Sequence, residues 1–243
     1  MKKYIITLIA SLILVSALGA PAFAVEQTVQ TGKTEQTDQT KLATIISKGD
    51  QEIERRLTAL NAAAKVITQT EKLSQSDRQT LTDEISSTVA GLTALKTKLD
   101  ADTTLTSARA DAKSILTQYR VYALVLPKVR LVKVADGQIA LEAKFSELSS
   151  KFLQRFSELK AAGQNTSALE VTLSNMNIKV ENASAISVAI QTKVIALQPS
   201  DYNTDHTILS GDRDQLKTAH DDLVAARADA KTIADGIKAL TQK

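Results

Sequence analysis

Residues 201–212 carry the residue types of a calcium-binding loop. Asp201, Asn203 and Asp205 place oxygen ligands at the first, third and fifth positions, and an acid, Asp212, stands at the twelfth. Two residues depart from the pattern. His206 occupies the position where the sharp turn requires Gly, and Asp212 is shorter than the bidentate Glu that usually closes the loop. Calcium is therefore the one cofactor that the sequence suggests, on an imperfect match.

The same residues also fit the start of a helix. Pro199 favours a turn, and Asp201, Asn203 or Thr204 could then cap the free backbone N–H groups of the next helix. A cap needs only one of these side chains, whereas calcium needs several of them together. The helix start is the favoured interpretation, and the calcium loop stays open as the alternative.

A second segment, residues 112–135, combines basic and apolar residues and contains no acidic residue. One interpretation is a buried joint between two halves of the protein, with long basic side chains reaching outward. The other is a patch that docks on an anionic membrane or cell-wall polymer. The joint is favoured because core helices often have this composition. The residues that would contact an anionic surface are Lys113, Arg120, Lys128, Arg130 and Lys133.

Catalytic motifs are missing from the sequence. The only histidines are His206 and His220, cysteine is absent, and neither a nucleophile elbow nor a zinc-protease motif occurs. Residues 157–160 match S-x-x-K, but the elements that accompany it in penicillin-binding enzymes are absent. We therefore expect a protein that is not an enzyme.

The N-terminus has the three parts of a secretory signal peptide. Lys2 and Lys3 precede an apolar stretch, and residues 22–24, Ala-Phe-Ala, form a small-x-small cleavage site. The signal peptide is predicted to span residues 1–24, which makes the mature chain exported and periplasmic, cell-surface or extracellular. No later segment is apolar enough to span a membrane, so the mature chain should be soluble.

Charge excludes one broad class of partner. Removal of Lys2 and Lys3 with the signal peptide would lower the formal net charge from +3 to +1. A general polyanion binder would show a much larger basic excess, so nucleic acid is not expected as a partner.

The elements that must position these residues are helices. Residues 25–40 form Thr-ending triplets with little to bury, which predicts a disordered Thr/Gln-rich linker. From residue 42 onward, apolar residues recur at steps of three and four, which predicts helices with one apolar stripe each. A capping box is expected at Ser76 and Gln79, a helix end at Gly163 and a helix start at Ser167 and Glu170. The predicted helices span about 42–67, 76–99, 103–126, 139–163, 167–197 and 209–240.

These six helices predict an all-α fold, an elongated antiparallel helical bundle built from two related three-helix halves. The first unit would cover residues 41–127 and the second residues 128–243. The sequence ARADAK at 108–113 recurs unchanged at 226–231, which favours an internal duplication. The alternative is that the two segments are unrelated and resemble one another only because both lie in alanine-rich helices. In both copies the small Ala residues would allow a neighbouring helix to approach closely.

Several strings carry a resemblance to a known kind of protein. The turn LQPSDYN at 197–203, YRVY at 119–122 and the closing ARADAK with its following Ile resemble uncharacterised exported, coiled-coil-like helical proteins of bacteria. The resemblance implies the helical architecture and brings no activity, cofactor or site. We expect an exported scaffold or protein-interaction module of the cell envelope, which binds an unknown protein partner or itself. The alternative is a peripheral binder of anionic membrane or cell-wall polymer through residues 113–133.

Overall fold

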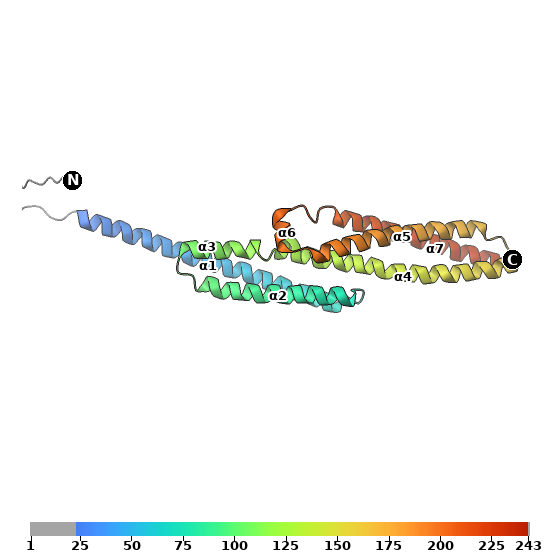
Figure 1. Cartoon of the computed structure of the whole chain (residues 1–243), viewed down its shortest axis with the longest axis horizontal. Coiled ribbons are helices and arrows are strands. Elements are labelled where there is room, and N and C mark those ends of the chain that lie inside the picture. Colours follow the sequence, from blue (N-terminus) through green and yellow to red (C-terminus); the bar gives the residue numbers. More distant parts are fainter. Residues whose placement is uncertain (1–22, 243) are drawn as a thin grey trace, which may run out of the picture. The chain divides into compact units, whose positions relative to one another are not determined.

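A computed structural model describes residues 23–242, with side chains described from residue 36 onward. Those residues form seven α-helices and one short π-helix, and no strand occurs among them (Figure 1). None of the helices between residues 23 and 242 combines the length and apolarity that crossing a membrane requires. The predicted all-α fold class is therefore confirmed.

Helix α1 runs from Phe23–Gln69, and it includes the stretch predicted to be a disordered linker. The prediction of a disordered 25–40 thus differs from the structure. A physical reason is that this tract contains no proline, and each residue added to an existing helix gains a backbone hydrogen bond without a new nucleation cost. The predicted signal peptide lies mostly outside the described residues. Residues from Leu42 onward form one compact unit, which the rest of this description concerns.

Helix α2, Gln75–Asp100, packs closely against α1. Gly49 of α1 has no side chain, and Leu99 of α2 packs directly over it. The N-cap of α2 is Ser74, whose hydroxyl accepts a hydrogen bond from the Asp77 N–H at 3.0 Å. The cap lies two residues before the predicted Ser76, because Ser74 is the residue that leaves the helical conformation.

Helix α3, Leu105–Thr117, is shorter than the predicted helix 103–126. The chain breaks at Arg120, which has a left-handed φ of 41°, and resumes as the π-helix η1, Val121–Val125. In η1 the Leu126 N–H bonds to the Val121 carbonyl five residues back, which widens the turn just before Pro127. The wider turn gives room to a proline ring that would otherwise clash in a regular helix. The break thus precedes Pro127 instead of falling on it.

Helix α4, Leu126–Ala161, continues from η1 and is about 54 Å long at 1.5 Å per residue. It ends as predicted near Gly163, which has a φ of 78°. The Gly163 N–H bonds to the Lys160 carbonyl and the Gln164 N–H to the Leu159 carbonyl. These two hydrogen bonds form the Schellman motif, in which glycine takes the left-handed position at low steric cost.

Helix α5, Ser167–Ala196, returns along α4. Hydrogen bonds pair Gln138 with Ser187, Glu142 with Ser184, and Ser149 with Asn177. The residue numbers on α5 thus fall as those on α4 rise. The two helices are therefore antiparallel. The start of α5 is set by Thr166, one residue before the predicted Ser167, and its hydroxyl donates to Glu170 at 2.7 Å.

After α5 come the short α6, Pro199–Thr204, and the long α7, Asp212–Thr241. Helix α7 begins after Gly211, whose φ of 81° reverses the chain. Lys193 of α5 meets Asp212 of α7, and Lys179 meets Asp229 further along, so α7 is antiparallel to α5. Figure 1 shows α4, α5 and α7 side by side.

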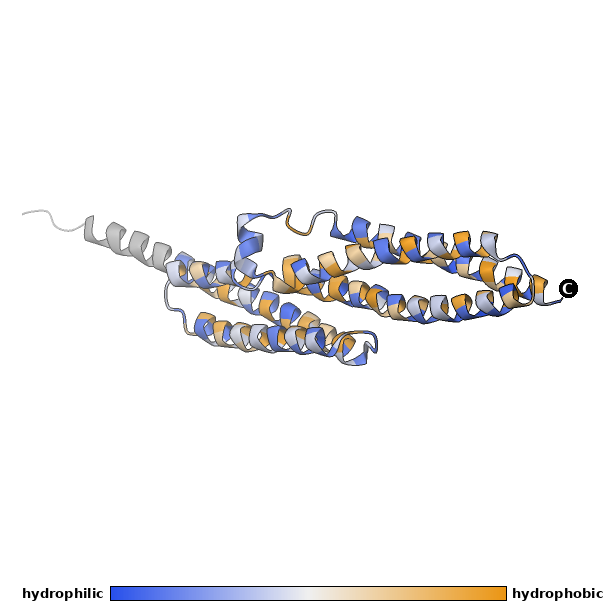
Figure 2. Ribbon diagram, turned by 45° about the vertical axis from the view of Figure 1, so that its right-hand side comes forward, coloured by the Kyte–Doolittle hydropathy of each residue, from blue (hydrophilic) through white to orange (hydrophobic). Residues whose placement is uncertain are grey.

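The apolar stripes meet in two hydrophobic clusters, and hydrophobic and hydrophilic residues alternate along the helices that supply them (Figure 2). The first contains residues of α1, α2 and α3, with Val129, Val132 and Ala135 of α4, Ile190 and Val194 of α5, and Leu216 of α7. The second contains Phe152 and Phe156 of α4 with residues of α5 and α7. Helix α4 therefore belongs to both clusters, and the boundary predicted between residues 127 and 128 falls inside it.

Candidate functional site

Lys128 was predicted to contact an anionic surface, but its side chain is completely buried. Its ammonium group donates to both oxygens of Glu84, at 2.8 and 2.9 Å, and to the Leu197 carbonyl at 2.5 Å. Three elements, α2, α4 and the end of α5, meet at this one side chain. A buried and fully partnered ammonium group cannot reach an external ligand, so Lys128 is a structural residue of the junction.

Arg120, the second predicted contact residue, is also engaged inside the molecule. Its Nε donates to the Asn203 side chain at 2.6 Å, and its guanidinium lies over the Tyr202 ring, 5.4 Å from the centroid. Asn203 in turn donates to the Thr117 carbonyl at 2.8 Å. These contacts hold α6 against the break between α3 and η1, where the chain has its left-handed residue.

The three remaining predicted residues, Lys113, Arg130 and Lys133, are exposed. Among residues 36–242 none of the three has an ion-pair or hydrogen-bond partner. The five predicted residues therefore do not form one surface, because Lys128 faces the core and Arg120 binds α6. The sequence could not separate them, since exposure depends on which side of α4 meets α2.

The four residues of the predicted calcium loop point to different partners. Asp201 accepts from the Gln198 N–H at 2.8 Å and caps α6, which is the helix start favoured from the sequence. Asn203 binds Arg120. Asp205 accepts from the Thr207 side chain and N–H, and these hydrogen bonds hold the pKa of the Asp205 carboxyl below its usual value.

Asp212 lies apart from the other three and is almost completely buried. Both of its oxygens accept from Lys193, at 2.8 and 3.1 Å. Within the described part of the chain, no group of three or more His, Cys, Asp or Glu residues is arranged to hold a metal ion. The four predicted ligands are instead divided among a cap at Asp201, a hydrogen bond from Arg120 to Asn203, a turn at Asp205 and an ion pair at Asp212.

A pair of buried carboxyl groups lies beside the Lys128 junction. Asp136 of α4 accepts from the Ser74 N–H at 2.7 Å, and Asp77 of α2 accepts from Gln191 of α5 at 2.5 Å. Burial, together with the negative charge of Asp77, raises the pKa of Asp136 from 3.8 to about 6. The two acids link α2, α4 and α5, and no feature of the sequence had singled them out.

A groove of about 630 Å³ lies between α4 and α7 and is a candidate for a ligand site. Its walls are apolar: Pro127, Leu131, Val134, Leu209 and Leu216. Its volume falls within the range of about 300 to 1,000 Å³ that small-molecule sites occupy.

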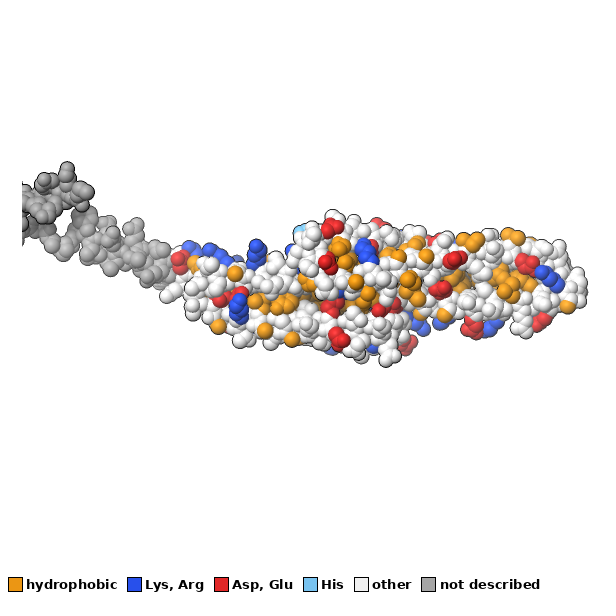
Figure 3. Space-filling view, viewed as in Figure 1, with side chains coloured by type: hydrophobic (Ala, Val, Ile, Leu, Met, Phe, Trp, Pro, Cys, Tyr) orange, Lys and Arg blue, Asp and Glu red, His pale blue; other side chains and the backbone are white. Residues whose placement is uncertain are grey.

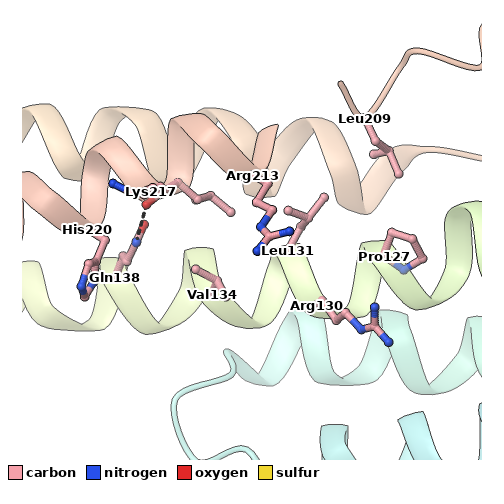
Figure 4. A pocket seen from close by; sticks show the side chains of 10 residues that line it. Pro127, Arg130, Leu131, Val134, Gln138, Leu209, Arg213, Lys217 and His220 are labelled. Carbon is pink, nitrogen blue, oxygen red and sulfur yellow. Dashed lines mark hydrogen bonds between the residues drawn. The ribbon is translucent and has the colours of Figure 1, made fainter. Parts of the chain in front are cut away.

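A hydrogen-bond network beside this groove fixes α7 against its neighbours. Gln138 of α4 donates to the Leu216 carbonyl at 2.9 Å and accepts from Ser187 of α5 at 2.7 Å (Figure 4). Both ends of the Gln138 amide are thereby partnered in a buried position, which sets the spacing of α4, α5 and α7. The groove is thus held by rigid elements and not by a loop alone.

Four nitrogen-bearing side chains also line this groove: Arg130 of α4 and Arg213, Lys217 and His220 of α7. No acidic residue lines it. Lys217 pairs with Asp221 at 2.7 Å, whereas Arg130 and Arg213 have no hydrogen-bond or ion-pair partner within residues 36–242. Sequence reasoning identified Arg130 only, because the other three lie more than 80 residues further along the chain.

Helix α5 has an unusual outward face, the second candidate surface. The residues that α5 buries recur at alternating steps of three and four, as in a coiled coil, and are Leu173, Met176, Val180, Ala183, Ser187, Ile190 and Val194. On the opposite side Val171 is 63% exposed and Ile178 is 52% exposed, with Val188 at 44%. Figure 3 shows hydrophobic side chains along the surface formed by α4, α5 and α7.

The outward side of α7 differs in charge and is typical of a solvent-exposed helix face. It carries the ion pairs Lys217–Asp221 and Lys231–Asp235, one helical turn apart in each case. The outward side of α5 carries two charged residues, Glu170 and Glu181, among uncharged ones. We call the residues Val171, Ile178, Ala185, Val188 and Thr192 the α5 face.

Comparison with known proteins gave no match to a protein family, a curated protein or a solved structure. The function is therefore argued from the geometry of these surfaces.

Proposed function

We propose that this chain is an exported, non-enzymatic helical interaction protein of the bacterial cell envelope, and that the α5 face is where a helix of a partner docks. The observation that carries the proposal is the low charge and partly apolar character of this face, in contrast to the ion-paired outward side of α7. Val171, Ile178 and Ala185 recur every seven residues, which forms a stripe on one side of the helix. A helix laid along such a stripe can bury its own apolar side.

A second copy of the chain is one partner with the required chemistry. Two identical faces of low charge can pack on each other in a two-fold interface when the pairing keeps the Glu181 side chains of the two copies apart. A different envelope protein with an amphipathic helix would meet the same face. The exported location is part of the proposal and rests on the signal-peptide pattern of residues 1–24.

Two copies of ARADAK in similar surroundings support the proposed internal duplication. Ala108 and Ala226, the first residues of the copies, are both completely buried. The aspartate of each copy pairs with a lysine of the preceding α-helix in its unit: Asp111 with Lys98 at 2.8 Å, and Asp229 with Lys179 at 2.5 Å. We propose on this ground that the chain arose as two related three-helix units, α1–α3 and α4, α5 and α7, in an elongated antiparallel bundle.

The interaction surface is tested with the double variant Val171→Glu/Ile178→Glu in the chain that lacks residues 1–24. Both side chains are exposed, so helix content measured by circular dichroism should not change. Sedimentation velocity reports self-association, and cross-linking in envelope extract reports another partner. The matched control is Val224→Glu, a 55% exposed valine on α7. The proposal requires that the double variant lose the association and that the control keep it.

If the double variant and the control both associate as the parent chain does, the α5 face is rejected as the docking surface. Export is tested separately by fractionating cells and determining the N-terminal residue of the purified chain. A chain that begins at Val25 in the envelope or the medium supports export, whereas an uncut chain in the cytoplasm contradicts it.

A second candidate function is peripheral binding to an anionic membrane or cell-wall polymer. Lys113, Arg130 and Lys133 favour it, because they are exposed and have no acidic partner among residues 36–242. Reversing the charges of Lys113 and Lys133 to Glu should then release the protein from anionic vesicles and from the envelope at lower salt. Unchanged vesicle binding would remove this candidate.

A further inference from the structure

The groove between α4 and α7 combines free positive charge with apolar walls. We propose that it binds a single anionic amphiphile, a molecule with a carboxylate or phosphate head and an aliphatic tail, which enters as a monomer. The inference goes beyond the proposed docking of a helix, because it uses other residues on another side of the bundle.

The head of the ligand is assigned to Arg130 and Arg213. Both arginines line the groove, and neither has a partner within residues 36–242. A guanidinium group offers parallel N–H donors that match the two oxygens of a carboxylate or phosphate. In Figure 4, Arg213 reaches from α7 toward Leu131 of α4, whereas Arg130 extends from α4 away from Arg213.

Three lysine side chains that lie between helices have acidic partners, and Arg213 differs from them in this respect. Lys98, Lys179 and Lys193 each reach an aspartate on the neighbouring helix. Arg213 also reaches toward a neighbouring helix, but α4 presents no acidic residue to it there. Because no acidic residue lines the groove beside Arg213, an anionic ligand can bind this guanidinium group. Lys217, which also lines the groove, is already paired with Asp221 at 2.7 Å.

The tail of the ligand is assigned to the apolar walls. Val134 is 46% exposed although it faces this groove, and Leu131 and Leu209 are only partly buried. A hydrocarbon chain laid along them would remove their surface and its own from water, which is favourable in proportion to the area buried. Charge and apolar surface thus lie within one groove of about 630 Å³.

The proposal is tested by titrating the chain lacking residues 1–24 with dodecanoate and with dodecyl phosphate, each kept monomeric, in a calorimeter. One ligand should bind per chain. Dodecyl maltoside, which has the tail without the charge, and acetate, which has the charge without the tail, should each bind at least about tenfold more weakly. Equal binding of the uncharged amphiphile would overturn the assignment of the head.

The decisive variant is Arg130→Gln/Arg213→Gln, compared with Arg109→Gln/Arg227→Gln as a control of equal charge. Arg109 on α3 and Arg227 on α7 are exposed and do not line the groove. We expect the first variant to bind dodecanoate at least about tenfold more weakly and the control to bind as the parent chain does. Thermal unfolding of both should match the parent, since none of the four side chains has an internal partner.

Three results would overturn the proposal. The Arg130 and Arg213 variant could bind as tightly as the parent, the monomers could fail to bind while anionic vesicles do, or the control could lose binding equally. The second result would favour the membrane-surface function instead. Val171→Glu/Ile178→Glu should bind dodecanoate normally, so failure of the α5 face and failure of the groove are told apart.

Discussion

Lys128 is a completely buried lysine, and it meets Glu84 in the centre of the junction. Removing an ion from water is costly, and the cost is offset only when the ion is well partnered. Here two carboxylate oxygens and the Leu197 carbonyl supply three acceptors, one for each ammonium proton. The arrangement therefore makes the junction sensitive to the loss of either charge.

Replacing Lys128 by Met should destabilise the chain by about 3 kcal/mol, because it leaves the Glu84 charge and the Leu197 carbonyl without their donor. Urea unfolding followed by circular dichroism measures the change. The control is Lys151→Met, which removes an exposed ion pair with Glu147 and should change stability little. Equal effects of the two substitutions would show that the buried pair has no special role.

The pair Asp136 and Asp77 makes stability depend on pH at the same junction. Because the pKa of Asp136 is raised in the folded chain to about 6, the folded state keeps a proton that the unfolded state releases between pH 3.8 and 6. The extra stability is fully present below pH 3.8 and is lost as the pH rises through about 6. This direction is opposite to that of a carboxylate held in an ion pair.

Asp136→Asn should therefore raise the free energy of unfolding at pH 8, on the order of 1 to 3 kcal/mol, and change it little at pH 4. The amide keeps an acceptor for the Ser74 N–H and carries no charge beside Asp77. Urea unfolding at pH 4, 6 and 8 gives the slope for both chains. If the parent and the variant lose stability equally over this range, Asp136 is not the group responsible.

At the scale of single helices, glycine positions show how closely the elements pack. A methyl group at Gly49 of α1 would overlap Leu99, a completely buried side chain of α2. A methyl group at Gly137 of α4 would meet nothing within 4 Å. Both glycines lie inside helices, where Ala is favoured over Gly by about 1 kcal/mol on propensity alone.

The two glycine-to-alanine substitutions should therefore have opposite signs. Gly137→Ala should raise the free energy of unfolding by about 0.5 to 1 kcal/mol through helix propensity. Gly49→Ala should lower it by about 1 kcal/mol, because overpacking costs of about 1 to 3 kcal/mol exceed the propensity gain. Thermal unfolding of the two variants tests this, and a stabilised Gly49→Ala would mean that α1 and α2 can move apart cheaply.

At the scale of the whole unit from Leu42 onward, α4 joins the two hydrophobic clusters. Its first turns contribute Val129 and Val132 to one cluster, and its later turns contribute Phe152 and Phe156 to the other. The helix has no break between residues 126 and 161. We therefore expect the two clusters to unfold together.

Phe156→Ala tests this cooperativity, since it removes a buried ring from the second cluster and should cost about 3 to 5 kcal/mol. Tyr119, Tyr122 and Tyr202 all lie outside that cluster, so tyrosine fluorescence reports the other part of the unit. The fluorescence and circular dichroism midpoints in urea should shift together. A fluorescence midpoint that stays unchanged would show two independent folding units.

The sequence by itself determined the helices and most of their ends. Steps of three and four between apolar residues placed α2, α5 and α7 within a few residues, and Gly163 marked the end of α4. These signals are local, so they can be read without knowing which helices meet. Helix α1 also includes the predicted spacer 25–40, whose composition lacks apolar residues for a core but does not forbid a helix.

Only the tertiary structure decided which of the chemistry-bearing residues are available. Lys128 and Arg130 are two residues apart, yet one is buried against Glu84 and the other lines a groove with Arg213. Exposure of a helical residue depends on the direction from which the neighbouring helices approach, and that direction is set by contacts between distant parts of the chain. For the same reason the acids of residues 201–212, close in sequence, were divided among a cap, an ion pair and a turn.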